Sequence, residues 1–403
     1  MSTLTRRADI PGATPGAAAT GLRVCLVTRQ EPGTTGTSRY VESMVRELRA
    51  IAGSTLDLVY LPTRPAGVVA KGLAVGRLAR LDLSTFLAQY PVALSWPRAD
   101  VYHLTVQTYA SLLFANPPPG AVLVTVHDVI PYLTRHDPGL RSYGHAVHRA
   151  FDRLAMRGLR RAERLVADST WTRDTLVEAV GVDPGRVTVV PLGVDGERYR
   201  PGEVPADVRR RYELHEGYRY VVYVGSEDPR KDLPVLWRAF AELYREAPDV
   251  RLVKVGAAHV ADERRRLRAL ATELGIEPAV RFLDHVPEGD LPFLYRAASV
   301  CVVPSRYEGF GLPVLEAMAC GTPVVCARAS SLPEVAGDAA LLVPPHDPAA
   351  LAGGLRRLLA DEPWRRAQIQ RGLARAGQFT WRRTAAAMLA QYQALAGPAE
   401  QKI

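Results

Sequence analysis

Two carboxylates in one short stretch of the chain have a spacing that suits a ligand site. Glu308 lies in a glycine-rich loop, and Glu316 follows eight residues later, inside a predicted helix. A helix that starts just after such a loop points its backbone N–H groups at any anion bound there. Glu316 could instead offset the helix dipole, and Glu308 could be a solvated loop residue. The stretch is therefore a candidate anion site with two carboxylates of undecided role.

Two adjacent cations, Arg230 and Lys231, precede another predicted helix, which carries Pro234 in its first turn. Cations at a helix N-terminus oppose the helix dipole, so an anion between them and the helix explains the arrangement better than solvated charge does. A guanidinium can bind two phosphate oxygens at once, while an ammonium acts as a point charge. We expect both side chains at the surface of a cleft, in contact with phosphate.

Four further residues are of a type, or lie at a position, that suits catalysis or ligand binding. His127 ends the predicted strand 122–126, where ligands of open α/β sheets gather, although a hydrogen-bonded rim histidine fits as well. Ser169 opens a predicted helix that ends at Gly181, and capping explains it more simply than ligand binding does. Gly33 and Gly36 lie in a loop between a strand and a helix, but the full dinucleotide-binding spacing is absent.

Elements that alternate between strand and helix must position these residues. Apolar runs of strand length occur in two series, separated by the charged, proline-marked segment 197–217: 22–28, 56–61, 100–104, 122–126, 165–167 and 187–190, then 220–224, 251–255, 280–283, 299–303 and 324–327. Alternation of this kind predicts parallel sheets with helices on both faces. We therefore predict an α/β protein with two Rossmann-like, doubly wound domains that face a cleft.

The domain boundaries follow from composition. Residues 1–20 have the make-up of a disordered tail, 21–196 form the first domain, 197–217 the linker, and 218–380 the second domain. Residues 62–98 between predicted strands remain unassigned. No apolar run reaches the length of a membrane span, and no apolar segment follows Arg6 and Arg7 as a signal peptide would require. Four cysteines without a C-x-x-C pair favour a reduced, cytoplasmic setting.

A net charge of +9 narrows the classes of partner. Aromatic residues make up 7% of the chain and do not interleave with a basic stripe, which argues against nucleic acid. The predicted helix 141–164 carries an apolar side and an arginine side, the latter formed by Arg149, Arg153, Arg157, Arg160 and Arg164. Such a helix can lie on an anionic membrane, and it can equally be an ordinary packed helix with a solvated face. No two aspartates are separated by a single residue, and no cluster has metal-ligand spacing, so no metal and no other cofactor is predicted.

The segment from Glu308 to Ala317 resembles the E-x7-E signature of the retaining glycosyltransferases of family four, which have the GT-B fold. Similarity extends from Pro304 to Val325, and more weakly over 22–397. Pro229-Arg230-Lys231 resembles the family's Pro-Arg-Lys motif, and Asp284 to Pro287 resembles its nucleobase-reading segment. The helix 381–395 resembles the C-terminal helix that crosses back to the first domain, so 381–403 is expected to pack there.

The resemblance implies a site residue by residue. Glu308 and His127 would contact the donor sugar, with His127 also facing the acceptor, Glu316 would bind the ribose, and Arg230 and Lys231 would grip the diphosphate. Further donor contacts are implied for one set of loop and strand-end residues: Gly33, Gly36, Ser169, Gly225, Ser226, Val286, Gly309, Phe310, Gly311 and Leu312.

The activity that the resemblance implies is retaining, metal-independent transfer of a hexose from a nucleotide-diphosphate sugar, with GDP-mannose the first candidate and a UDP sugar the second. The acceptor would be a glycan, a lipid-linked molecule or a small molecule, with an anionic membrane surface as a further contact. An epimerase of the same fold and a non-catalytic sugar-nucleotide binder are the alternatives. A phosphorylase would need a pyridoxal-binding lysine and a longer chain.

Overall fold

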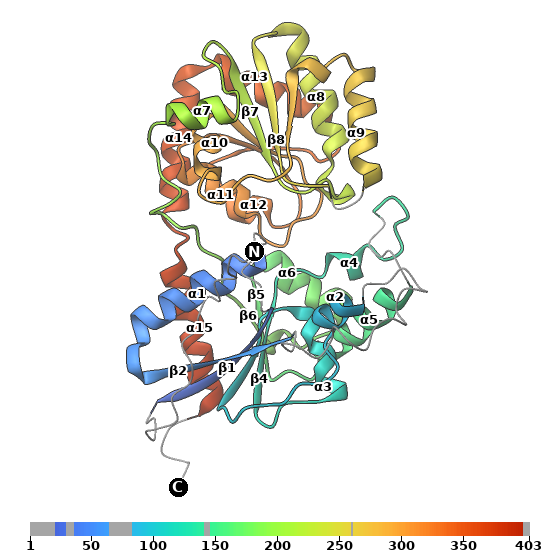
Figure 1. Ribbon diagram of the computed structural model, residues 1–403, viewed down its shortest axis with the longest axis vertical. Coiled ribbons are helices and arrows are strands. Elements are labelled where there is room, and N and C mark those ends of the chain that lie inside the picture. Colours follow the sequence, from blue (N-terminus) through green and yellow to red (C-terminus); the bar gives the residue numbers. More distant parts are fainter. Residues whose placement is uncertain (1–20, 30–35, 64–82, 141–145, 259–260, 398–403) are drawn as a thin grey trace, which may run out of the picture.

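The computed structural model describes residues 21–29, 36–63, 83–140, 146–258 and 261–397, and these form two α/β domains stacked along the long axis of the molecule (Figure 1). Each domain is built on one parallel six-stranded sheet with helices on both faces. The predicted fold class of two Rossmann-like domains is confirmed. Gly33, the tail 1–20 and the end of the C-terminal segment, 398–403, lie outside the described residues.

The first sheet has the strand order β2-β1-β3-β4-β5-β6. Its central strands are continuous apolar runs because helices cover both faces, and Val24 to Val27 of β1 are fully buried. The strands are β1 (Leu22–Thr28), β2 (Leu56–Pro62), β3 (Val101–Leu104), β4 (Ala121–Val126), β5 (Arg164–Ala167) and β6 (Val187–Val189). The helices of this domain are α1 (Gly36–Ala52), α2 (Leu83–Gln89), α3 (Leu112–Ala115), α4 (Ile130–Leu133), α5 (Ala146–Leu159) and α6 (Thr170–Thr175).

The second sheet has the order β12-β11-β10-β7-β8-β9. Its strands are β7 (Arg219–Val224), β8 (Val250–Val255), β9 (Val280–Leu283), β10 (Val300–Val303), β11 (Val324–Ala327) and β12 (Leu341–Val343). The helices around it are α8 (Leu233–Glu246), α9 (Ala261–Glu273), α10 (Leu291–Ala297), α11 (Leu312–Ala319), α12 (Leu332–Ala336), α13 (Pro348–Ala360) and α14 (Glu362–Ala376). The carboxyl ends of both sheets carry the loops that meet between the domains.

Two segments cross between the domains side by side. The first runs from β6 to α7 (Ala206–Arg211), and the second joins α14 to α15 (Trp381–Ala396), which lies against α1 in the first domain (Figure 1). Val194 accordingly forms a bridge with Thr380, and a Cβ on Gly193 would lie 2.2 Å from the Trp381 backbone nitrogen. Tyr392 of α15 is buried and its hydroxyl lies 2.8 Å from His103 Nδ1.

Three details differ from the sequence-based expectations. The segment predicted as a charged linker contains a helix, α7, whose Val208 is buried. The unassigned region before β3 contains α2. The predicted basic helix ends at Leu159 rather than at Arg164, because Arg160 and Arg161 turn the chain into β5.

Within the described residues, no helix has the length and apolar character needed to cross a membrane. All four cysteines are buried and unpaired.

Candidate active site

Glu308 lies at the centre of a charged cluster on the loop between β10 and α11. Its Oε1 accepts hydrogen bonds from Lys231 Nζ at 2.5 Å and Ser305 Oγ at 2.8 Å. Its Oε2 lies 3.4 Å from an Arg230 guanidinium nitrogen, and the same nitrogen donates to the Tyr307 carbonyl at 2.8 Å. The structure therefore brings together three of the predicted residues, from segments 77 residues apart.

The charge of Glu308 depends on this cluster. The carboxylate is 7% exposed, and burial alone would raise its pKa. The charges of Lys231 and Arg230, with the hydrogen bonds from Lys231 and Ser305, outweigh burial and hold the pKa of Glu308 below its ordinary value. Burial and the charge of Arg230 lower the pKa of Lys231, which is 9% exposed. Lys231 is thus buried, contrary to the expectation of a cleft-surface position, because Glu308 draws its ammonium inward.

Local turn geometry places the two cations. Asp228 caps a single 3₁₀ turn by accepting a hydrogen bond from the Arg230 backbone N–H at 3.0 Å. Asp232 then takes a left-handed conformation, with φ of 55°, and leads into α8 with Pro234 in the first turn, as predicted. On the facing loop, Gly311 has φ of 107°, a conformation that suits glycine, and starts α11.

His127 ends β4 with both ring nitrogens engaged. Nδ1 lies 2.7 Å from Asp168 Oδ2, and Nε2 lies 3.1 Å from the Thr105 carbonyl oxygen. Because both partners can accept a hydrogen bond, this arrangement favours a ring that carries two protons. Burial lowers the pKa of His127, but the Asp168 carboxylate outweighs it and raises the pKa above its ordinary value. The structure thus contains the hydrogen-bonded alternative for His127.

The first domain meets the Glu308 loop at Gly309. A Cβ on Gly309 would lie 2.0 Å from the His127 carbonyl oxygen, so glycine permits this close approach. Ser169 caps α6 by accepting from the Thr172 backbone N–H at 3.0 Å. Its hydroxyl also lies 2.7 Å from the Gly309 carbonyl oxygen, to which it donates. Ser169 thus caps the helix, as its sequence position suggested, and also contacts the Glu308 loop; its contact with a donor stays a prediction.

Glu316 is paired across the interface between the domains. Its Oε1 lies 2.5 Å from an Arg39 guanidinium nitrogen of α1, and its Oε2 accepts from the Tyr295 hydroxyl at 2.9 Å. The charge of Glu316 raises the pKa of Arg39. Arg39 Nε is buried and has no hydrogen-bond partner among the described residues. A ribose that binds Glu316 must therefore share or replace the Arg39 contact.

A small cavity of about 70 Å³ surrounds this ion pair, and Leu312 of α11 borders it. Gly36 lies nearby, since a Cβ on it would be 3.9 Å from the Leu312 side chain. The Phe310 ring packs instead against Phe379 and is 5% exposed. Val286 is half-buried against the same core, and the Ser226 carbonyl, next to Gly225, accepts from the Tyr223 hydroxyl.

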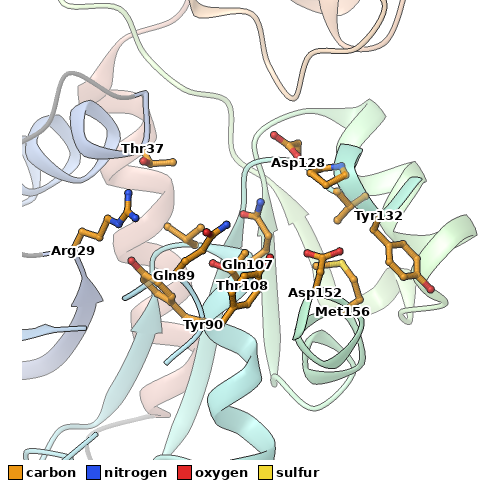
Figure 2. A pocket seen from close by; sticks show the side chains of 14 residues that line it. Arg29, Thr37, Gln89, Tyr90, Gln107, Thr108, Asp128, Tyr132, Asp152 and Met156 are labelled. Carbon is orange, nitrogen blue, oxygen red and sulfur yellow. The ribbon is translucent and has the colours of Figure 1, made fainter. Parts of the chain in front are cut away.

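A second cavity, of about 320 Å³, opens in the first domain beyond the carboxyl ends of β3 and β4 (Figure 2). Arg29 and Thr37 lie on one side of it, and Asp128 and Asp152 on the other (Figure 2). Amide, hydroxyl and aromatic side chains lie between them: Gln89, Tyr90, Gln107, Thr108 and Tyr109. The cavity reaches the Glu308 loop through Asp128, because a Cβ on Gly309 would lie 3.0 Å from the Asp128 Cβ.

Sequence reasoning missed several residues of this arrangement. Arg39, Asp168 and Tyr295 each become partners of a predicted residue through contacts that no local pattern reveals. Asp128 carried one signal, its place directly after His127 at the end of a strand. Within the ranges that the structure describes, no group of three His, Cys, Asp or Glu residues has the geometry to hold a metal ion.

Two family models match this chain, one to each domain. Residues 14–193 match the glycosyl transferase 4-like domain, and residues 206–375 match the glycosyl transferases group 1. The chain belongs to the group 1 glycosyltransferases, a family with the GT-B fold. The sequence of its second domain carries the motifs that resemble this family.

Similar curated proteins share part of their length with this chain. The D-inositol 3-phosphate glycosyltransferase of Acidothermus cellulolyticus is 43% identical over 242 residues, which are 58% of this chain and 53% of that protein. The O-antigen chain mannosyltransferase B of Escherichia coli is 37% identical over 223 residues, which are 55% of this chain and 58% of that protein. The chain thus spans little more than half the length of these relatives.

Solved structures share the fold over nearly the whole chain. Sucrose-phosphate synthase from Thermosynechococcus elongatus superposes with a TM-score of 0.71 at 24% identity, covering 93% of this chain and 99% of that one. HepE from Anabaena, in complex with UDP and glucose, superposes with a TM-score of 0.70 at 20% identity, covering 93% of this chain and 100% of that one. These likenesses show the two-domain architecture.

Proposed function

We propose that this protein is a retaining glycosyltransferase that transfers a hexose from a nucleotide-diphosphate sugar to a hydroxyl acceptor. The cluster of Glu308, Arg230 and Lys231 beside Gly309 supports this proposal most directly. It combines a carboxylate that stays charged while buried with two cations at the start of α8. Family membership and the paired Glu316 support the same assignment.

The chemistry assigns a task to each charge. As the bond between the anomeric carbon and the diphosphate oxygen breaks, negative charge grows on the departing phosphate, and Arg230 and Lys231 stabilise it. Glu308 orients the sugar as its carbon becomes electron-poor, and His127 contacts the sugar once its Nε2 exchanges the Thr105 carbonyl for a sugar hydroxyl. The acceptor oxygen bonds to the same face of that carbon, and its proton passes to the departing phosphate. Two cations and helix N–H groups balance the diphosphate without a metal ion.

The donor remains a choice between two candidates. A GDP sugar, with mannose as the hexose, is favoured by the similarity to a mannosyltransferase, and a UDP sugar by the fold shared with a structure that contains UDP. A thermal-shift panel separates them, because a ligand at about 100 times its dissociation constant adds about 2.7 kcal/mol of stability. Stabilisation by neither class of nucleotide would contradict the proposal.

Turnover gives the decisive test of the class of function. We expect release of nucleoside diphosphate that depends on an added acceptor, and a product whose anomeric configuration, read by NMR coupling constants, equals that of the donor. An epimerase would change the donor without an acceptor, and a non-catalytic binder would release nothing. An inverted product would contradict retention while leaving the transferase assignment in place.

Contact with an anionic membrane is a further part of the proposal. Arg149, Arg153 and Arg157 repeat every four residues along α5 and are exposed. Arg160 is excluded from this stripe, because its guanidinium donates to the Val180 carbonyl at 2.7 Å. After sedimentation with anionic liposomes at low salt, the wild type should be found in the pellet with the liposomes, and an Arg149/Arg153/Arg157→Glu variant should stay in the supernatant. Equal recovery of both proteins in the supernatant would contradict membrane contact.

A further inference from the structure

A chain of four buried polar side chains lies between the first sheet and the helices α1 and α15. The Tyr392 hydroxyl lies 2.8 Å from His103 Nδ1, and His103 Nε2 lies 2.8 Å from the Thr125 hydroxyl oxygen. That oxygen lies 3.0 Å from the Tyr40 hydroxyl. Each of the four residues is at most 1% exposed, so the links between them lie inside the protein. The chain therefore joins α15, β3, β4 and α1 through side chains alone.

The protons of this chain have one arrangement that gives every donor an acceptor. Burial lowers the pKa of His103 to about 3, so one of its ring nitrogens donates and the other accepts. The Tyr392 hydroxyl can donate to Met44 Sδ, at 4.0 Å, which leaves its oxygen to accept from His103 Nδ1. His103 Nε2 then accepts from Thr125, and Thr125 accepts from Tyr40. Thr125 therefore needs its hydroxyl, because it donates and accepts at the same time.

Tyr40 connects this chain to the candidate active site. Its ring meets the His127 ring edge to face, with centroids 4.9 Å apart and planes at 78°, an arrangement that aromatic rings favour. Burial raises the pKa of Tyr40, and the charge of Asp168, which pairs with His127 Nδ1, adds to this rise. The preceding residue, Arg39, reaches across to Glu316 of the second domain. Tyr40 thus lies between His127 and the turn of α1 that contacts the second domain.

The orientation of the His127 ring depends on what surrounds it. On the proposed function, its Nε2 leaves the Thr105 carbonyl for a sugar hydroxyl while Nδ1 stays with Asp168. Rotation about that one remaining hydrogen bond is then limited by the ring of Tyr40, which the contact with Thr125 holds at its far end. A displacement of a reacting group by about 1 Å can cost about 10²-fold in rate.

We propose that Thr125 is a positioning residue for the transfer reaction, which acts on His127 through the ring of Tyr40. The inference rests on the proposed function and adds a residue that no local pattern marks, within an otherwise apolar strand. His103 and Tyr392 extend the same support to α15, the helix that follows the second crossing between the domains (Figure 1). The position of His127 therefore depends on how α15 packs against the first sheet.

Two substitutions at one position separate positioning from core stability. Thr125→Val keeps the shape of the side chain but breaks both hydrogen bonds, whereas Thr125→Ser keeps the hydroxyl. In acceptor-dependent turnover by the full-length protein, Thr125→Val should lower kcat about 10–100-fold. The KM for the donor should stay close to that of the wild type, because the predicted diphosphate and ribose contacts lie elsewhere. Thr125→Ser should restore a kcat close to that of the wild type.

Tyr102→Phe is the matched control. Tyr102 precedes His103 in β3, is 1% exposed, and its hydroxyl donates to the Pro97 carbonyl at 2.8 Å. Neighbouring residues of a strand point to opposite faces, so this control loses a tyrosine hydrogen bond on the face away from His127. Its melting temperature should fall while its kcat stays at the wild-type level.

NMR of the His127 imidazole gives a signature that a purely structural role would not change. The ring current of Tyr40 shifts the proton signals of His127, because the two rings are in contact. Thr125→Val should therefore move these signals, whereas Thr125→Ser and Tyr102→Phe should leave them in place. The spectrum of His127→Gln assigns them.

A folded Thr125→Val enzyme with the kcat of the wild type would overturn the inference. A loss of kcat without movement of the His127 signals, a loss that Thr125→Ser shares, or an equal loss in Tyr102→Phe would overturn it as well. If melting curves show that Thr125→Val does not fold, Tyr40→Phe, which removes only the hydroxyl, takes its place with the same expected results. Absence of acceptor-dependent turnover in the wild type would overturn the proposed function, and the positioning role with it.

Discussion

Glu308 is a carboxylate that stays ionised inside the protein because Lys231 and Arg230 surround it. These three charges satisfy one another in the structure. A donor diphosphate would compete with Glu308 for the cations and leave the carboxylate to the sugar. Donor binding at this site would thus exchange the partners of Glu308, Arg230 and Lys231 rather than fill vacant positions.

Replacing Glu308 by Gln should lower turnover more than donor binding. We expect a loss of roughly 10–100-fold in kcat, since a hydrogen bond to a charged group contributes about 1.5–3 kcal/mol. Stability should also fall by about 1–3 kcal/mol, because Lys231 loses its charged partner. Steady-state kinetics and thermal melts measure the two effects separately. An unchanged kcat in a folded variant would show that Glu308 does not act in the site.

Glu316 and Arg39 offer a test of ribose binding against simple ion pairing. Glu316→Gln should weaken the donor by roughly 1.5–3 kcal/mol, because a ribose hydroxyl loses a charged acceptor. Arg39→Met breaks the same ion pair but leaves Glu316 available, so donor binding should stay the same or become tighter. Calorimetric titration with the nucleotide compares them. Equal weakening in both variants would show that the ion pair itself, and not the ribose contact, matters.

His127 makes stability depend on pH in a stated direction. Its pKa in the folded protein is raised above the ordinary value of 6.5, so its contribution is complete below pH 6.5 and is lost as pH rises through the folded pKa. Burial also raises the pKa of the Asp168 carboxyl, which is hydrogen-bonded to the same ring. Melting temperatures of wild type and His127→Gln should converge above that folded pKa. An imidazole NMR titration with a midpoint at or below 6.5 would contradict the assignment.

The residue-scale predictions from sequence rest on local patterns and on the family resemblance. Arg230 and Lys231 were singled out because two cations before a helix are electrostatically odd, and Glu308 because its spacing to Glu316 resembles the E-x7-E signature; the structure brings these three residues together. Arg39 could not be found, since its partner lies 277 residues away and arginine on a helix surface is ordinary. The burial of Lys231 was missed for the same reason, because it follows from the position of Glu308.

At the scale of elements, the loop from β10 to α11 is held between α6 and α12. Ser169 and Thr172 of the first domain direct their hydroxyls to the Gly309 carbonyl, at 2.7 and 3.2 Å. Glu334 of α12 in turn accepts from the Thr170 and Trp171 backbone N–H groups at 2.9 and 3.0 Å. These contacts fix the Glu308 loop against the end of β4, where His127 lies.

Gly309→Ala should separate the two domains locally and leave each one folded. The added Cβ would lie 2.0 Å from the His127 carbonyl, so the loop must shift, and a displacement of about 1 Å can cost about 10²-fold in rate. Gly353→Ala is the control, because nothing lies within 4 Å of a Cβ there and alanine favours the helix α13. Equal kcat values for the two variants would show that activity does not depend on the close approach of the Gly309 loop to the His127 carbonyl.

Elements were predictable where apolar periodicity was strong. The strands β1 to β11 agree with their predicted ranges within about two residues, which is the usual uncertainty of an element end, whereas the edge strand β12 was not predicted. The helix α7 was missed because its arginine-rich sequence resembles a solvated linker, although Val208 packs into the core. The end of α5 was placed too late because Arg160 and Arg164 continue the arginine spacing after the helix has stopped.

At the scale of the molecule, α15 and the segment around Gly193 tie the two domains together on one side, while the Glu308 loop and α6 meet between them. Alternating strands and helices were enough to predict two sheets. The distance between the sheets was not predictable, because it depends on contacts such as Arg39–Glu316 and Gly309–His127 that join distant parts of the chain.

The most direct test is acceptor-dependent release of nucleoside diphosphate by the wild type, Arg230→Ala and Arg238→Ala, each measured with and without excess EDTA. The cations rather than a metal should stabilise the departing diphosphate, so the wild type should keep full activity in EDTA. Arg230→Ala should lose about 10²–10³-fold in kcat. Arg238→Ala, at an exposed position of α8, should behave as the wild type. Loss of wild-type activity in EDTA that Mg²⁺ or Mn²⁺ restores, or an unimpaired Arg230→Ala enzyme, would contradict the account.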